Sequence, residues 1–252
     1  MSDIDSSRRF GGIIRLYGEA AFARFSHAHI AVIGVGGVGS WAVEALARSG
    51  IGTLTLIDLD NVAESNINRQ LAALSSTIGK AKVDVLAERC LDINPTITIH
   101  RIEDFIEREN LAELITPHFD YVLDCIDSFR IKAALAAHCK RHKIKLITVG
   151  GAGGQIDPTK IRLSDLSKTL QDPLLARMRK ELRQHYHFPQ NPKRRFDIPA
   201  VWSEEAIKIP QNGPACDLSC AGGIGSITTV TASFAFVAVS HVLSKLATQS
   251  ST

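Results

Sequence analysis

A cluster of glycines between two apolar runs is the part of this sequence best suited to hold a phosphate. The glycines are Gly34, Gly36, Gly37 and Gly39. Glycines let the backbone turn tightly and approach a phosphate with no Cβ in the way. The helix expected after them points its unpaired N–H groups and the positive end of its dipole at the same place. The pattern predicts a nucleotide site.

Two aspartates follow the next apolar run, where a strand would end. Asp58 stands about 20 residues past the glycines, a position from which a carboxylate can hold ribose hydroxyls. Asp60 comes shortly after it. This pattern alone does not distinguish NAD from ATP, because many dehydrogenases share it. An NAD-dependent oxidoreductase is therefore one candidate function.

Polar and charged side chains further along the chain favour ATP. They are Asn66, Arg69 and Gln70 after the second strand, Lys82 on the next helix, and Asp127 at the end of a later strand. Arginine and lysine have no task beside a neutral nicotinamide, but they neutralise the charge that builds up on an α-phosphate under attack. A carboxylate at Asp127 suits Mg²⁺ held against phosphate oxygens. We expect Arg69, Lys82 and Asp127 to be catalytic, whereas Asp60 and Gln70 have a structural capping role as the alternative.

Alternating apolar runs and amphipathic segments predict the elements that position these groups. Strands are expected at residues 31–33, 53–57, 96–100, 121–126 and 146–149, and helices at 8–25, 38–49, 80–92, 111–116 and 131–142. A return strand is expected within residues 155–163. This alternation indicates an α/β, Rossmann-like, doubly wound and mostly parallel sheet with an antiparallel extension. We expect one domain over residues 1–252, with ligands at the carboxyl ends of the strands.

Composition narrows the class of protein. The chain is 45% apolar and its net charge is +3, so bulk charge does not indicate a protein that binds DNA or any other nucleic acid. Its five cysteines form no C-x-x-C pair, so we expect neither a zinc site nor a disulfide framework. An odd cysteine count without a secretory signal indicates the cytoplasm.

The apolar tail approaches the length of a membrane span. Residues 221–239 contain no charged side chain. They are also dense in Gly, Ser and Thr, which favours a core helix of the domain. Membrane association through residues 221–243 is the alternative.

Residues 172–200 differ in kind from the rest of the chain. Four prolines and a dense basic run predict a flexible, mobile insertion that leaves the core. The basic residues are Arg177, Arg179, Lys180, Arg183, Lys193, Arg194 and Arg195. Cations follow phosphates, and the aromatic rings that interrupt the run can stack on bases. RNA contact is thus one reading, and a solvated loop is the other.

The motifs together resemble the adenylating ThiF/MoeB/HesA family, which is related to the ubiquitin-activating enzymes. They are G-x-G-G-x-G at 34–39, D-x-D at 58–60, S-N-x-x-R-Q at 65–70, Lys82, and L-D-C-x-D at 123–127. The resemblance implies that Asp58 holds the ribose of ATP, that Asn66, Arg69 and Lys82 contact its phosphates, and that Asp127 binds Mg²⁺. It also implies a homodimer and a monovalent cation, Na⁺ or K⁺.

Two departures from the family stand out. Its sulfur-carrier activators hold a structural zinc between C-x-x-C pairs, which this chain lacks. They also supply a phosphate-binding arginine from the N-terminal helix across the dimer, and its aligned position here is Gly12. Arg9 or Arg15 is the substitute we consider.

Further segments, spread over nearly the whole chain, resemble bacterial members of this family that dehydrate threonylcarbamoyladenosine at position 37 of tRNA. The resemblance rests on segments 9–18, 148–159, 165–174, 202–205 and 220–226. It implies ATP-dependent adenylation of the threonyl carboxylate, followed by ring closure. The substrate attacks itself at high effective concentration, so no enzyme nucleophile is needed.

Cys220 leaves other functions open. It is a possible sulfur acceptor from a cysteine desulfurase, or else a small buried residue in a glycine-rich turn. The alternatives to the tRNA enzyme are therefore adenylation of a ubiquitin-like sulfur carrier protein and a non-catalytic sulfur-relay partner.

Overall fold

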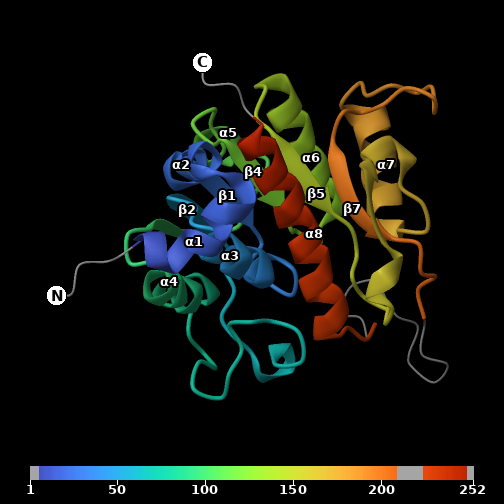
Figure 1. Cartoon of the computed structure of the whole chain (residues 1–252). Helices are drawn as coiled ribbons and strands as arrows, with labels where there is room; N and C mark the ends of the chain where they lie inside the picture. Colours follow the sequence, from blue (N-terminus) through green and yellow to red (C-terminus); the bar gives the residue numbers. More distant parts are fainter. Residues whose placement is uncertain (1–5, 209–223, 249–252) are drawn as a thin grey trace.

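A sheet with helices on both faces forms the centre of the molecule (Figure 1). The computed structural model describes residues 6–208 and 224–248. The strands are β1 His29–Ile33, β2 Thr53–Ile57, β3 Thr98–Ile102, β4 Tyr121–Asp124, β5 Leu146–Val149, β6 Ile161–Asp165 and β7 Pro199–Ser203. The helices are α1 Ser6–Tyr17, α2 Glu19–His27, α3 Gly39–Arg48, α4 Lys82–Ile93, α5 Leu111–Leu114, α6 Phe129–Arg141, α7 Pro173–His185 and α8 Thr228–Ala247.

The seven strands lie in the order β3-β2-β1-β4-β5-β7-β6. Every neighbouring pair is parallel except β6 with β7. The doubly wound fold and its antiparallel extension are confirmed. The chain winds outward from β1 to β3 and then returns to β4 on the other side of β1. Ligands of such sheets bind where the winding reverses, which here is at the carboxyl ends of β1 and β4.

Hydrophobic clusters cover the two faces of the sheet. In β1, Ile30 and Val32 belong to one cluster, while Ala31 and Ile33 belong to the other, as the two-residue period of a strand requires. The first cluster includes residues of α2, α3, α4 and α8, and the second includes residues of α5, α6 and α7. Both faces of the central strands are buried, which is typical of a parallel sheet.

The N-terminal segment forms two helices rather than the single expected one. Gly18 separates them with a φ of 84°, a region that favours glycine. The break changes which side chains face inward. Phe25 is buried, whereas Leu16 is 79% exposed and Ala20 is exposed.

Residues 172–200 pack into the core, and the expectation of an excursion away from it was wrong. They contain α7, which lies against α6 (Figure 1). Leu175, Met178 and Leu182 are buried on the inner face of α7 at helical spacing. Strand β7 then enters the sheet between β5 and β6. The amphipathic pattern is hard to see in the sequence, because many cations lie between the apolar residues and occupy the outer face of the same helix.

The apolar tail forms α8, which packs against α2 and α3. By length and composition α8 could cross a membrane, but much of it is buried within the protein. Its inward residues include Val230, Phe234 and Val242. The expectation of a core helix is confirmed over the part of the tail that the structure describes.

Candidate active site

The glycine turn closes tightly over the end of β1. Gly34 has a φ of 78°, and a Cβ placed on it would lie 3.0 Å from the Cys125 carbonyl oxygen. A Cβ on Gly39 would lie 1.9 Å from the Gly34 carbonyl oxygen. Neither position therefore tolerates a side chain without movement of the backbone. The loops after β1 and β4 meet here, and the Cys125 N–H donates to the Ile33 carbonyl over 2.9 Å.

Asp58 joins the glycine turn to the loop that follows β2. Its carboxylate accepts the Val35 N–H over 2.7 Å and the Asp60 N–H over 2.9 Å. Burial raises the pKa of Asp58, while the Lys82 ammonium and these two N–H groups oppose that rise. Each carboxylate oxygen has a second lone pair, so Asp58 is left with acceptor capacity at the carboxyl edge of the sheet.

Lys82 and Asp60 form an ion pair beside Asp58. The Lys82 Nζ lies 2.7 Å from the Asp60 Oδ2, and the lysine is only 4% exposed. Lys82 begins α4, and its N–H donates to the Asp60 carbonyl. Both interactions fix the lysine at the same edge as the glycine turn. Because the aliphatic part of the Lys82 side chain is buried, its ammonium group is held in one position.

The loop after β2 brings Asn66, Arg69 and Gln70 to this edge. The Asn66 Oδ1 accepts the Ala63 N–H over 3.0 Å. The Asn66 amide NH₂ has no hydrogen-bond partner among the described residues. The Arg69 Nη1 donates to the Ser65 carbonyl over 2.8 Å, and the arginine stem passes 3.5 Å from where a Gly37 Cβ would be. The arginine therefore lies at the glycine turn.

Gln70 carries an unsatisfied polar atom next to the glycines. Its Oε1 is buried and has no hydrogen-bond partner among the described residues. The Nε2 of the same amide lies 3.7 Å from where a Gly36 Cβ would be. A buried acceptor without a partner costs about 1–3 kcal/mol, so it indicates a site that a ligand or water completes.

The loop after β4 carries Asp127 and is held in place by the buried Lys132. No role for this lysine was predicted from the sequence. The Lys132 Nζ lies 3.0 Å from the Asp124 Oδ1 and donates to the carbonyls of Asp124 and Ile126. Both Lys132 and Asp124 are fully buried. Lys132 shares the inward face of α6 with Leu135 and Cys139, and a lysine on such a face signals a buried acidic partner.

Asp127 itself is exposed and has no hydrogen-bond or ion-pair partner among the described residues. Within that part of the chain, no group of three His, Cys, Asp or Glu side chains is placed to hold a metal. The donor set fits Mg²⁺ bound through one carboxylate and substrate phosphates. It does not fit an all-protein metal cage.

The described cysteines are poor nucleophiles. Burial raises the pKa of Cys90, Cys125 and Cys139 to about 12 in each case. Thiols of this kind stay protonated at neutral pH and form no thioester readily. Cys220, the candidate sulfur acceptor, lies outside the described residues.

The candidate RNA-binding cations divide between the two edges of the sheet. Arg177 and Arg179 lie in the first turns of α7, where Asp172 accepts the Gly151 N–H at the carboxyl edge. The Arg177 guanidinium lies over the Phe129 ring at 6.0 Å. At the other edge, Arg195 lies 3.9 Å from Asp197, just before β7 begins. Arg183 stacks on the Phe196 ring, and Lys180, Lys193 and Arg194 are at the surface.

Comparison with known proteins places this geometry in a family. The model of the ThiF family matches residues 10–252. The chain belongs to the ThiF family. The family expected from the glycine, aspartate, arginine and lysine motifs is confirmed.

Two curated relatives match nearly the whole chain. The tRNA threonylcarbamoyladenosine dehydratase of Haemophilus influenzae is 55% identical over 251 residues, covering 98% of this chain and 96% of the relative. That of Escherichia coli is 50% identical over 250 residues, covering 95% and 93%. A crystal structure of the E. coli enzyme in complex with ATP superimposes with a TM-score of 0.89 at 50% identity, covering 95% of this chain and 94% of that one.

Proposed function

We propose that this protein is a tRNA threonylcarbamoyladenosine dehydratase that uses ATP to cyclise the modified adenosine at position 37 of tRNA. The observation that carries the proposal is the near full-length identity with dehydratases. The crevice adds chemical support, because its cations and its lone carboxylate lie where a triphosphate would need them. No comparable support exists in the described residues for a nicotinamide reaction.

The chemistry assigns each group a role. The glycine turn and the N-terminus of α3 cradle the phosphates, and Asp58, backed by Asp60, receives the ribose hydroxyls. Asn66, Arg69 and Lys82 donate to the phosphates, and the unpaired amide oxygen of Gln70 accepts from the nucleotide or its water. Asp127 would hold Mg²⁺, which would neutralise charge on the phosphate oxygens.

The proposed reaction has two steps. A threonyl carboxylate oxygen attacks the α-phosphorus of ATP, and the bond to pyrophosphate breaks. The carbamoyl group then attacks the activated carbonyl carbon, loses a proton, and expels AMP together with the former carboxylate oxygen. Arg69 and Lys82 stabilise the negative charge that develops on the α-phosphate in the first step. The enzyme contributes alignment and charge rather than a nucleophile.

A homodimer fits the surface next to this crevice. Four large apolar side chains are exposed there: Ile67, Leu74, Ile227 and Phe236. The loop after β2 and the start of α8 form one surface, because the Thr228 hydroxyl donates to the Asn68 carbonyl. Exposed large apolar side chains next to the crevice favour a partner surface, and we propose that a second copy covers them.

Such a dimer would supply an arginine from the N-terminal helix of the partner. Of the two candidates, Arg9 already donates to the Ile93 carbonyl over 2.7 Å at the C-terminus of α4. Arg15 is exposed and has no hydrogen-bond or ion-pair partner among the described residues. We therefore assign the role to Arg15, since Gly12 carries no charge. The proposal also places the protein in the cytoplasm, and a monovalent cation, Na⁺ or K⁺, follows from the family resemblance alone.

Mass analysis of nucleosides tests the function directly. Purified protein is incubated with tRNA carrying threonylcarbamoyladenosine, with and without ATP and Mg²⁺. We expect the modified nucleoside to lose one water only when ATP is present, with AMP and pyrophosphate formed in equal amounts. If the nucleoside stays unchanged when the modified tRNA, ATP and Mg²⁺ are all present, the proposal is refuted. Transfer of AMP to a carrier protein would favour the alternative in which the enzyme activates a sulfur carrier.

A further inference from the structure

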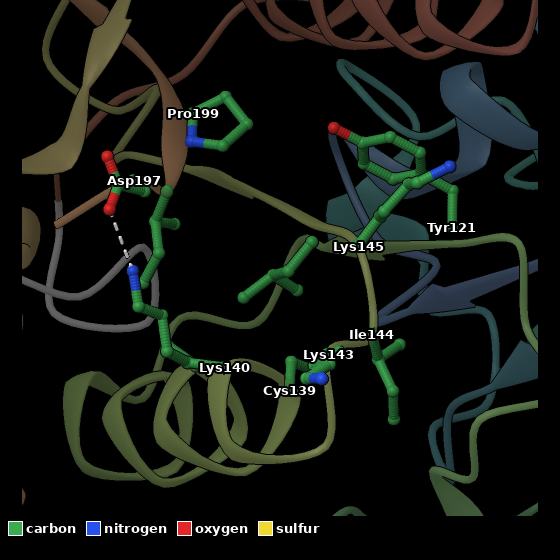
Figure 2. A pocket seen from close by; sticks show the side chains of 11 residues that line it. Tyr121, Cys139, Lys140, Lys143, Ile144, Lys145, Asp197 and Pro199 are labelled. Carbon is green, nitrogen blue, oxygen red and sulfur yellow. Dashed lines mark hydrogen bonds and ion pairs between the residues drawn. The ribbon is translucent and has the colours of Figure 1, made fainter. Parts of the chain in front are cut away.

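A pocket of about 240 Å³ opens at the edge of the sheet opposite the candidate active site. It lies beside the amino ends of three strands, at Tyr121 of β4, Leu146 of β5 and Pro199 of β7 (Figure 2). Its floor is apolar, and three lysines line it: Lys140, Lys143 and Lys145. None of the functional roles assigned above uses this pocket.

The charge of the pocket is only partly compensated. Asp197 is the acidic residue of its lining, and it lies 3.0 Å from the Lys140 Nζ. Figure 2 shows this pair on one side of the pocket, with Tyr121 and Lys145 on the other. Lys143 and Lys145 are exposed, and neither has an acidic partner among the described residues. Two uncompensated cations at a concave site favour an anion.

Lys143 occupies a backbone position that favours glycine. It follows the end of α6 with a φ of 58°, where a left-handed glycine commonly ends a helix. A lysine there costs roughly 1–2 kcal/mol relative to glycine. A strained residue at a pocket is a sign of function, although a cation near a helix C-terminus also gains from the helix dipole. The two accounts make different predictions for a glycine variant.

Helix α6 connects this pocket to the candidate active site. It begins just after Asp127 and ends at Arg141, which is about 20 Å at the rise of an α-helix. The basic run expected to contact RNA adjoins the pocket, since Arg195 and Lys140 both approach Asp197. A polyanion that reaches the crevice at one end of α6 therefore meets a second group of cations at the other.

The nucleophile nearest to the pocket is inert. Cys139 lines it, but burial raises the pKa of this thiol to about 12. The Tyr121 hydroxyl lies 3.2 Å from the His241 ring nitrogen rather than standing free. These groups indicate a binding site and not a second catalytic centre.

We propose that this pocket binds a backbone phosphate of the tRNA substrate, through Lys143 and Lys145, at a distance from the nucleotide that reacts. The inference rests on the proposed function for the identity of its ligand. Free inorganic phosphate shares the same chemistry. A tRNA differs in that the ribose-phosphate chain also spans the cations along α6 and α7.

Binding of tRNA at several salt concentrations tests the pocket. The variant Lys143→Gly/Lys145→Gln is compared with the wild type. We expect the slope of log K against log salt to be less steep by about one, since the pocket holds one phosphate and each neutralised phosphate contributes roughly one. Binding at low salt should be about tenfold weaker. Turnover at saturating tRNA should stay the same, because both lysines lie far from the crevice.

Two controls keep the test decisive. Arg101→Gln removes one exposed cation from β3, at the other side of the sheet, and should leave the slope unchanged. Lys143→Gly alone should keep or raise the melting temperature while weakening tRNA binding. A fall in melting temperature with unchanged binding would show that the lysine serves only the helix end.

Other results separate the remaining outcomes. An unchanged slope and affinity in the double variant would overturn the proposal. A second result would also overturn it. In that case inorganic phosphate protects the wild type against heat, the double variant loses this protection, and the double variant still binds tRNA normally. Cyclisation by the wild type is measured in parallel. If the wild type cyclises tRNA and the double variant binds tRNA normally, only the inference about the pocket fails. If the wild type does not cyclise tRNA, the proposed function is refuted instead.

Discussion

The two buried lysines at the carboxyl edge of the sheet and the two pocket lysines at its amino edge are held in opposite ways. At the carboxyl edge, Lys82 and Lys132 are buried and each is paired with an aspartate. At the amino edge, Lys143 and Lys145 are exposed and carry no acidic partner among the described residues. A buried, paired cation has one geometry and suits a developing charge at a fixed atom. An exposed cation is mobile and screened by salt, which suits a long polyanion.

The largest effect is expected at the glycine turn. Gly39→Ala places a Cβ 1.9 Å from the Gly34 carbonyl oxygen. We expect the free energy of unfolding to fall by about 4 kcal/mol or more, because backbone rather than a side chain must move. Urea unfolding measures the change. Gly12→Ala is the matched control, since nothing lies within 4 Å of its added Cβ, and a helical alanine should be neutral or stabilising.

The buried pair beneath Asp127 should come next. Lys132→Met leaves the Asp124 carboxylate buried without its cation, which costs about 3–5 kcal/mol of stability. Chemical denaturation of the single variant and of Lys132→Met/Asp124→Leu provides the measurement. We expect the double variant to recover much of the loss. A single variant as stable as the wild type would contradict the structural role assigned to this edge.

A loss of turnover without a loss of tRNA binding is expected for Lys82→Ala. Removing one donor to a developing anion lowers kcat by about 100- to 1000-fold. Asp60 can stay hydrated in the variant, because its side chain is 55% exposed. Single-turnover formation of the cyclic nucleoside measures the effect. Lys80→Ala, an exposed neighbour in the same loop, should behave like the wild type, and equal losses in both variants would remove Lys82 from the mechanism.

The smallest effect concerns the exposed cations before β7. Replacing Arg194 and Arg195 with glutamate should weaken tRNA binding and flatten its dependence on salt, with little change in ATP affinity. Filter binding over a salt series tests this. If the variant binds tRNA at low salt as well as the wild type does, these two arginines do not contact the RNA. The contrast drawn between the two edges would then be contradicted.

The nucleotide half of the molecule was predictable because its signals are local. The glycines from Gly34 to Gly39, the adjacent strands and Asp58 lie close together in sequence, and each residue type has one clear physical reason. The chemistry of a phosphate under attack pointed to Arg69, Lys82 and Asp127, the family motifs agreed, and the fold brings all three to the same edge. How these groups contact ATP stays a prediction.

The other half depends on contacts between distant segments. Strand β7 pairs with β5 across some fifty intervening residues, and no local pattern indicates that partner. The inner face of α7 was hidden by its charged outer face. Lys132 was overlooked because its partner Asp124 becomes visible only when α6 packs beside β4. The pocket at the amino edge arises from β4, β5, α6 and the chain before β7, so the sequence order does not reveal it.

The central claim is that the threonyl carboxylate of the tRNA attacks the α-phosphorus of ATP at the carboxyl edge of the sheet. The most direct test uses tRNA whose threonyl carboxylate carries oxygen-18, incubated with the protein, ATP and Mg²⁺, with mass analysis of the released nucleotide. The account predicts one labelled oxygen in AMP for each tRNA cyclised. Label in inorganic phosphate with formation of ADP, or label released into water, would contradict it.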